Sequence, residues 1–552
     1  MIDPLLFTTA TVAGLYTATR AYQRIQLSLA KHPSLTGHTR MAKRVARMIP
    51  GYAYDESRFF DSDEAPLEIV ARRRKAFAEL CTYYDTHYTH SAALTAQARE
   101  GISDLQFTGA YRVPFQYSAY LRRHLRLGSF VRASSGVEVE DLDGNRFLDL
   151  TGSYGVNLLG YDFYKECIAA GAAQVQALGP VLGQYHPTVA DNVQALRRIS
   201  GLDEVSFHMS GTEAVMQAVR LARYHTGRTH VVRFPGAYNG WWEDVQPGPG
   251  NPLAPRHTYT LRDMHPRTLH VLATRKDIAC VVVNPLQALH PNAGAPGDSS
   301  LIDSSRRAGV DHEAYARWLS QLREVCTARG IVLILDEVFV GFRLARGGAQ
   351  EYFGVRADLV TYGKTLGGGL PVGVLCGRAD LMKRYREERP VDICFARGTF
   401  NAHPYVMGAM NVFLKHLESP TMQALYDGLD ERWGRRLARM NDAMAAANLP
   451  VRVAGLSSIW TILYNEPSRY NWMFQFYLRR HGLGLSWVGS GRLIFSLNYD
   501  DVQFDEVVRR FVAAGLAMRE GGWWHAQAGA SNRQIRRSVL REMMARRFFG
   551  RA

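Results

Sequence analysis

Residues 331–376 constrain the fold more than any other part of the chain: they read IVLILDEVFVGFRLARGGAQEYFGVRADLVTYGKTLGGGLPVGVLC. They begin with an apolar, β-branched run, which is typical of a strand buried on both faces of a parallel sheet. The run ends in charge at Asp336 and Glu337. In open α/β sheets ligands bind outside the carboxyl ends of the strands, so we expect Asp336 to lie in a ligand crevice.

A lysine in the same stretch suits the same crevice. Lys364 stands between a strand-like segment at 359–362 and the glycines at 367–369. Small neighbours let a planar ring approach, and desolvation lowers the pKa of a lysine, which makes its neutral amine available to form an imine. An acid opposite a pyridine nitrogen makes the ring a better electron sink, so Asp336 and Lys364 together suit pyridoxal 5′-phosphate (PLP). The alternative is a buried capping aspartate and a solvated surface lysine.

The surrounding residues carry a family resemblance. This stretch closely resembles the class III (fold type I) PLP-dependent aminotransferases, and within them the glutamate-1-semialdehyde 2,1-aminomutase-like branch. The residues that carry the resemblance are DEV, then GFR, then GGAQEYFGVRADLVTYGKTLGGGLPVG. The resemblance covers about residues 128–520. It implies an α/β fold of fold type I, with a large domain built on a mainly parallel sheet flanked by helices and with a small α+β domain. It also implies PLP as cofactor, with Lys364 forming the Schiff base, Asp336 pairing with the pyridinium nitrogen and Val338 packing on one ring face.

The segment VSFHMSGTEA predicts a phosphate-binding turn. An expected strand at 205–208 runs into Ser210, Gly211 and Thr212 and then into a helix with apolar residues at helical spacing. Backbone N–H groups at a helix start form an anion site, and a glycine lets a phosphate come close. The same letters also make a good helix cap. Beside Asp336 and Lys364 they resemble the phosphate loop of the family, which implies that all three residues bind the cofactor.

Two further cofactor contacts rest on the resemblance alone. FPGAYNGWW, residues 234–242, resembles an aromatic-x-Gly element of the family, which implies that Tyr238 stacks on the ring face opposite Val338. RGTFNAHPYVMGAM places Thr399 where the family uses a threonine of the neighbouring subunit to bind the phosphate. The resemblance therefore implies a homodimer with shared active sites. Asn284 stands where the family usually has a glutamate.

The match weakens at the positions that the aminomutase uses for its carboxylated substrate. Its N-terminal arginine aligns near Ala119, with arginines only nearby, and its C-terminal glutamate aligns near Gly491. An anion in a dry pocket needs oriented donors, so these losses argue against a small dicarboxylate-like substrate and favour a larger, more apolar one with one anionic end. The candidate substrate-binding residues are Tyr154, Trp241, Arg122 and Arg492.

These features predict an enzyme, a class III PLP-dependent transaminase. It would move an amino group from an amine or amino-acid donor to an aldehyde or keto acceptor. The biosynthetic branches of the family imply an acceptor that is a small molecule or an acyl chain, free or bound to a carrier protein. Two alternatives stay open: glutamate-1-semialdehyde 2,1-aminomutase, and an inactive PLP-fold scaffold or membrane-tethering protein.

Composition narrows the choice of partners. The chain has 552 residues, enough for a large core, and its six cysteines form no CxxC pair, so we expect neither disulfides nor a metal site. A cytoplasmic location fits this cysteine usage. The net charge of +15 suits an anionic partner. No nucleic-acid motif is present, and the basic tail alternates arginine with apolar residues as surface or lipid-contacting helices do, so we expect no nucleic-acid partner.

The N-terminal residues suggest contact with a membrane. Residues 2–19 are mostly apolar, and basic residues follow as far as Arg47. Such a segment is typical of a weak anchor or a surface helix held by anionic lipids at the inner face of a membrane. The alternative is a helix that packs on the body of the protein or on its dimer mate.

The pattern along the chain predicts its domain organisation. We expect one long helix near 409–448 in the C-terminal part. The expected segments are a helical N-terminal extension at 1–127, whose residues 1–30 would contact a membrane or a partner; small-domain strands at 128–165; a large PLP-binding domain at 166–410; a C-terminal small domain at 411–525; and a basic helix or tail at 526–552.

Overall fold

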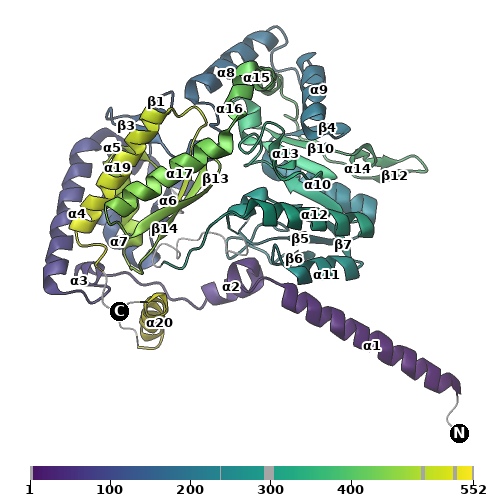
Figure 1. The fold of residues 1–552 in the computed structure, drawn as a ribbon, viewed down its shortest axis with the longest axis horizontal. Coiled ribbons are helices and arrows are strands. Elements are labelled where there is room, and N and C mark those ends of the chain that lie inside the picture. The colour runs from purple at the N-terminus through teal and green to yellow at the C-terminus, as the bar shows by residue number, and fades with distance from the viewer. Residues whose placement is uncertain (1–3, 237, 291–303, 486–490, 526–530, 550–552) are drawn as a thin grey trace.

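The computed structural model describes residues 4–236, 238–290, 304–485, 491–525 and 531–549. A seven-stranded sheet lies at its centre, in the order β4-β10-β9-β8-β7-β5-β6 (Figure 1). β10 runs antiparallel to both neighbours, and all other pairs are parallel. This confirms the predicted mainly parallel sheet. The strands are β4 (Glu204–His208), β5 (His230–Arg233), β6 (Thr258–Thr260), β7 (Ile278–Val283), β8 (Val332–Asp336), β9 (Leu359–Gly363) and β10 (Gly373–Gly377).

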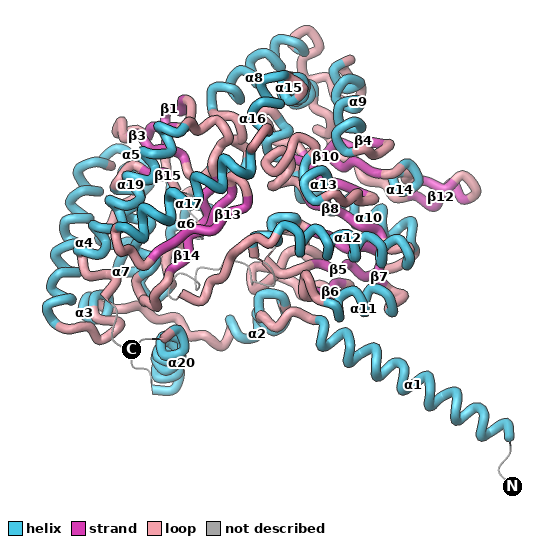
Figure 2. Tube along the Cα trace, in the orientation of Figure 1, coloured by secondary structure: helices cyan, strands magenta, loops and turns pink. Residues whose placement is uncertain are grey.

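The sheet is covered on both faces because its central strands are apolar throughout. Every residue of β7, β8, β9 and β10 is buried. Successive side chains of a strand point to opposite faces. Val282 therefore joins an apolar cluster with α10 (Gly211–Thr226), whereas Val281 joins the cluster that contains the buried side chains of α12 (His312–Arg329). Figure 2 shows this layering of helices around the strands.

Two further sheets, of three and of four strands, lie beside the large one. The first has the order β13-β14-β16 and the second the order β1-β2-β3-β15. α17 packs against β13, and α18 packs against α19. The elements of this part are β1 (Val131–Ser135), β2 (Glu138–Asp141), β3 (Arg146–Asp149), β13 (Val451–Leu456), β14 (Ile459–Tyr464), β15 (Leu483–Gly484), β16 (Arg492–Ile494), α17 (Leu429–Ala446), α18 (Phe474–Arg480) and α19 (Asp501–Glu520).

The prediction of one long helix near 409–448 is wrong, since three helices occupy this region. They are α15 (Pro404–Leu417), α16 (Pro420–Tyr426) and α17. Ser419 caps α16 through a hydrogen bond from the N–H of Met422, and Pro420 takes its first position. Gly428, with φ of 64°, separates α16 from α17. The apolar spacing continues across both breaks, which is why it predicted a single helix.

Helices alone are described before β1. They are α1 (Pro4–Ala30), α2 (Thr39–Ala46), α3 (Glu56–Phe60), α4 (Leu67–His87), α5 (Thr89–Arg99), α6 (Ser103–Tyr111) and α7 (Phe115–His124). Phe59 and Tyr117 pack with Trp472, so this part shares a core with α18 and its surroundings. The buried guanidinium of Arg73 pairs with Asp63 at 2.6 Å. The predicted domain boundaries stay a prediction.

The remaining helices complete the described part of the chain. They are α8 (Tyr161–Val175), α9 (Thr188–Ser200), α11 (Pro266–Thr274), α13 (Gly348–Phe353), α14 (Ala379–Met382) and α20 (Asn532–Phe549), and the hairpin β11 (Tyr385–Arg386)–β12 (Arg389–Ile393) follows α14. No helix among the described residues is long and apolar enough to cross a bilayer.

Glu337 fixes the edge of the sheet next to the predicted crevice. It follows Asp336 at the end of β8 and is 1% exposed. Its Oε2 accepts the N–H of Ala349 at 2.6 Å, and its Oε1 accepts the N–H of Gln350 at 3.3 Å, so it holds the start of α13. Burial raises the pKa of Glu337 to about 8 in spite of these hydrogen bonds.

We expect Glu337→Gln to flatten the dependence of stability on pH. The folded pKa of about 8 lies above the ordinary value of 4.5, so this carboxyl group ionises first in the unfolded chain. Its contribution to the free energy of unfolding is therefore largest below pH 4.5 and is lost as pH rises through about 8. Calorimetric Tm values between about pH 5 and pH 8 should fall less for E337Q than for the wild type.

The matched control is Glu313→Gln, because the side chain of Glu313 is 84% exposed. Its Tm should follow that of the wild type at each pH. Parallel curves for E337Q and the wild type would contradict the role given to Glu337.

Candidate active site

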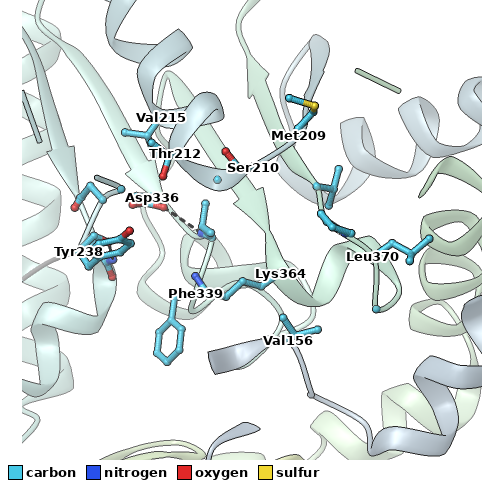
Figure 3. A pocket seen from close by; sticks show the side chains of 18 residues that line it. Val156, Met209, Ser210, Thr212, Val215, Tyr238, Asp336, Phe339, Lys364 and Leu370 are labelled. Atoms are coloured by element: carbon cyan, nitrogen blue, oxygen red, sulfur yellow. Dashed lines mark hydrogen bonds between the residues drawn. The ribbon is translucent and has the colours of Figure 1, made fainter. Parts of the chain in front are cut away.

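A cavity of about 390 Å³ lies where the ends of β8 and β9 meet the start of α10 (Figure 3). Seven of the eight residues predicted to bind the cofactor line it: Ser210, Gly211, Thr212, Tyr238, Asp336, Val338 and Lys364. The same sheet edge that the strand-end argument selected therefore carries a cavity.

Asp336 is the last residue of β8 and is 2% exposed. Its Oδ1 accepts hydrogen bonds from the N–H of Val338 and the hydroxyl of Thr361, each at 3.2 Å. Burial raises the pKa of Asp336 to about 6, against the opposing effects of these hydrogen bonds and of Lys364. Its Oδ2 accepts no hydrogen bond from a described residue, so a ring nitrogen that carries a proton would complete the pairing of this carboxylate.

Lys364 directly follows β9 and begins a short 3₁₀ turn, Lys364–Gly367. Its φ of 47° is left-handed, a conformation that strains residues with a Cβ and is common at functional sites. Its Nζ lies 5.5 Å from the centroid of the Phe339 ring. Burial lowers the pKa of Lys364, and the charge of Arg343 lowers it further, although Asp336 acts in the other direction. A larger share of neutral amine follows.

The turn beside Lys364 needs glycine. Gly155 has φ of 98°, and a Cβ added to it would lie 2.7 Å from the Phe339 ring and 3.2 Å from Cδ of Lys364. Gly155 therefore lets residues 152–155 approach the lysine more closely than any larger residue could.

The start of α10 is both a helix cap and an open anion site. Oγ of Ser210 accepts the N–H of Glu213 at 3.3 Å, and the carboxylate of Glu213 accepts the N–H of Met209 at 3.0 Å. The first N–H groups of a helix have no partner within the helix, so those at the start of α10 suit an anion. A Cβ on Gly211 would lie 2.6 Å from the side chain of Val338, which brings this turn close to the wall of the cavity.

The hydrogen bonds of Asn284 give a reason for its departure from the family pattern. Its Oδ1 accepts the N–H of Leu286 at 3.1 Å and caps the short turn Pro285–Leu289. Its Nδ2 donates to the carbonyl of Tyr238 at 3.2 Å. Asn284 therefore holds the loop that carries Tyr238, whose side chain is 60% exposed at the edge of the cavity.

These residues fit PLP. The start of α10 would hold its phosphate, Tyr238 and Val338 lie among the lining residues that would flank its ring, and Asp336 and Lys364 lie in the same cavity. The unused oxygen of Asp336 and the partly desolvated amine of Lys364 are the groups that this cofactor requires. Among the residues with described positions, no cluster of histidine, cysteine, aspartate or glutamate could hold a metal ion.

The other predicted site residues do not line this cavity. Thr399 is exposed, which a role in the active site of a partner subunit would require, but that role stays a prediction. Tyr154 and Trp241 are 50% and 66% exposed. Arg122 lines a separate cavity between α5, α6 and α7. Arg492 lies beside Phe339, with its guanidinium 5.8 Å from the ring centroid.

Sequence reasoning did not single out Phe339 or Thr361. Phe339 belongs to the same short segment as Asp336, and its contact with both Lys364 and Arg492 depends on how the chain turns after β8. Thr361 pairs with Asp336 in the register of β8 and β9. A polar residue near the end of the neighbouring predicted strand was the available signal for Thr361.

Comparisons with known proteins confirm the predicted family and fold class. The family model described as Aminotransferase class-III matches residues 119–244 and 301–514. The chain is 33% identical over 362 residues to a glutamate-1-semialdehyde 2,1-aminomutase of Geotalea daltonii, covering 62% of this chain and 78% of that protein. It is 31% identical over 367 residues to an aminomutase of the same name from Methanothermobacter thermautotrophicus, covering 64% and 81%.

Solved structures resemble the chain over most of its length. One described as a transaminase with PLP bound has a TM-score of 0.63 at 27% identity, covering 78% of this chain and 98% of the other. A glutamate-1-semialdehyde aminomutase from Pseudomonas aeruginosa PAO1 has a TM-score of 0.64 at 17% identity, covering 82% and 99%. The second likeness concerns the fold alone.

We expect Lys364→Ala to abolish turnover and Asp336→Asn to lower kcat by about a hundredfold or more, because the first removes the amine and the second removes the charge opposite the ring nitrogen. Both should be measured at saturating PLP, with the visible absorption of the lysine-bound cofactor as a second readout. That absorption should be missing from K364A and present in D336N.

The controls are Lys383→Ala and Asp380→Asn. Each changes one member of a surface ion pair, and the two side chains are 40% and 61% exposed. Both should keep wild-type kcat and absorption. Turnover by K364A would rule out this lysine as the group that carries the cofactor.

Proposed function

The chain belongs to the class III aminotransferase family, and on that premise we propose that it is a PLP-dependent transaminase whose amino donor carries one anionic group and whose carbonyl acceptor is largely apolar. PLP as the cofactor follows from the family and from the fit of the cavity. The choice of transamination and of this substrate class is the proposal.

The observation that carries the proposal is that the Phe339 ring contacts two cations. Nζ of Lys364 lies 5.5 Å and the guanidinium of Arg492 lies 5.8 Å from the centre of its ring. Nε of Arg492 is buried without a hydrogen-bond partner among the described residues. Burial lowers the pKa of Arg492 to about 10, and the charge of Arg306 acts in the same direction. A carboxylate would relieve both the missing hydrogen bond and the repulsion.

The apolar side chains that line the cavity favour an apolar acceptor. The lining includes Val156, Met209, Val215, Phe339, Leu370 and Pro371. Asp336 is the one carboxylate among the described lining residues, and its place is opposite the ring nitrogen. An acceptor with several charges would leave charged groups without partners here.

In the proposed reaction each residue of the site has a distinct role. When bound, PLP supplies an electron sink for the carbon that carries the amino group. Asp336 keeps a negative charge, held by Val338 N–H and Thr361, where the ring nitrogen needs a proton. Lys364, with its lowered pKa, takes a proton from the substrate carbon and returns it as general base and acid. Gly155 and Phe339 limit the water around the amine.

The second candidate function is glutamate-1-semialdehyde 2,1-aminomutase. The names of the relatives at 31–33% identity favour it. Against it stand the glycine at position 491, where the aminomutase glutamate aligns, and Arg122, which lies in a different cavity. A third reading, an inactive scaffold, is opposed by the geometry of Asp336 and Lys364.

Two parts of the proposal concern partners. We propose a homodimer in which Thr399 of one subunit binds the phosphate in the other, because Thr399 is exposed and does not line the cavity of its own chain. We also propose that the apolar acceptor is an acyl-chain aldehyde or ketone, free or carried by a protein.

The deciding experiment records the visible spectrum of the holoenzyme after the separate addition of glutamate 1-semialdehyde, amino acids and a medium-chain aliphatic amine. A transaminase should be converted to the pyridoxamine form by an amino donor and should then need a carbonyl acceptor to recover. Isomerisation of glutamate 1-semialdehyde without any other amine would instead establish the aminomutase reading.

We expect Arg492→Gln to raise KM for a carboxylated amino donor by about 10- to 100-fold, since a hydrogen bond to a charged group contributes roughly 1.5–3 kcal/mol. KM for an uncharged amine should change little. Steady-state kinetics with a matched pair of donors, one with and one without the carboxylate, measures the difference.

Arg452→Gln is the control, because Arg452 is an exposed residue of β13 in the same sheet. It should leave both KM values unchanged. An equal rise of KM for the two donors in R492Q would contradict a contact between Arg492 and the carboxylate.

A further inference from the structure

α20 presents an apolar stripe bordered by arginines. Leu540, Met544 and Phe548 recur every four residues and are 58%, 47% and 63% exposed. Residues at this spacing share one face of a helix. The exposed arginines beside them are Arg533, Arg536, Arg537, Arg541 and Arg547. This combination is typical of helices that lie at the boundary between lipid headgroups and acyl chains.

The one acidic residue of α20 is turned away from this stripe. The carboxylate of Glu542 pairs with Arg469 at 2.8 Å and with Arg58 at 2.9 Å, and Arg469 is 3% exposed. These contacts, with the buried Ile535 and Val539, hold the inner face of α20 on the body of the protein. The outer face is left with positive charge alone.

α2 and the residues after it continue the same kind of surface. Met41, Met48 and Ile49 are 49%, 54% and 41% exposed. The exposed basic residues here are Arg40, Arg44 and Arg47. The guanidinium of Arg547 donates to the carbonyl of Met48 at 2.5 Å, so the end of α20 lies against this segment.

α1 extends from this surface and adds apolar residues to it. Every described side chain from residue 11 to residue 22 is exposed, including Val12, Leu15 and Tyr16 at 66%, 65% and 60%. The far end of the helix is fixed to the body, since Leu27 and Ala30 are buried and Tyr22 contacts His270. α1, α2 and α20 lie along one edge of the molecule in Figure 1.

The charge of this region has one sign. Residues 4–54 contain no aspartate or glutamate, whereas their lysines and arginines are Arg20, Arg24, Lys31, Arg40, Lys43, Arg44 and Arg47. α1, α2 and α20 also lie outside the residues matched by the aminotransferase family model. The surface therefore lies outside the part of the chain that the family model matches.

We propose that α1, α2 and the outer face of α20 form a docking surface for an anionic lipid bilayer. The arginines would bind headgroups while the exposed apolar side chains enter the boundary with the acyl chains. A second copy of the chain fits this surface less well, because a two-fold interface would bring the same positive charges face to face. The proposal does not depend on which amino-group reaction the enzyme performs.

The test is cosedimentation of the full-length, PLP-loaded enzyme with phosphatidylcholine vesicles, with and without roughly one third phosphatidylglycerol. The wild type should bind the anionic vesicles and not the neutral ones. Binding should fall when salt is raised from about 0.1 M to about 1 M, where the Debye length shrinks from about 10 Å to about 3 Å.

Two sets of variants locate the contact. Arg533→Gln, Arg537→Gln and Arg541→Gln together should weaken binding at least about tenfold, since each basic residue near an anionic surface contributes about a factor of five. Leu540→Ser, Met544→Ser and Phe548→Ser together should also lower it at least about tenfold, as should Val12→Ser, Leu15→Ser and Tyr16→Ser. An unchanged PLP spectrum and Tm would establish that each variant is folded.

Matched controls alter equally exposed residues elsewhere. Val391→Ser, Val502→Ser and Leu253→Ser change side chains that are 92%, 78% and 65% exposed, and Arg317→Gln and Arg435→Gln change arginines that are 66% and 73% exposed. All should bind like the wild type. The proposal fails if the wild type does not bind anionic vesicles, binds neutral ones equally, or is matched by the α20 variants. It also fails if those variants reduce the molecular mass in solution, which would assign the surface to a second copy.

Discussion

The removal of water from Asp336 and Lys364 is the constraint on which the rest of the site depends. A carboxylate and an amine at the ends of two neighbouring strands would be unremarkable on a surface, where each keeps its ordinary pKa. Within the sheet, burial raises the pKa of Asp336 and lowers that of Lys364, so both groups move toward the neutral form. A bound ring that carries a proton on its nitrogen restores the charge of the aspartate. The apolar strands around them are thus a chemical requirement as well as a structural one.

Much of this could be read from the sequence because it is local. The apolar run that ends at Asp336, the glycines after Lys364 and the turn at Ser210 each identify a strand end or a helix start by composition alone. The mainly parallel central sheet follows from the family resemblance. Contacts between distant segments could not be read in this way. The pairing of Phe339 with Arg492 joins β16 to the residues after β8, and no periodicity encodes such a contact.

The break between α15, α16 and α17 marks another limit of sequence reasoning. Apolar spacing reports which face is buried, whereas a helix ends where a cap or a left-handed glycine competes with the next hydrogen bond. Ser419 and Gly428 act at this finer scale. In the N-terminal part the composition predicted helices, but the shared core of Phe59, Tyr117 and Trp472 depends on a segment that lies more than three hundred residues away.

The left-handed backbone of Lys364 has a consequence for how this protein would respond to selection. At such a φ, glycine is relaxed whereas lysine is strained, and the strain costs of order 1 kcal/mol or more. Replacing Lys364 with glycine would therefore raise the folding stability of the protein and remove the amine. A library of variants screened for heat resistance alone would therefore enrich inactive variants with glycine at position 364. A screen for thermostable variants of this enzyme needs to measure turnover at the same time.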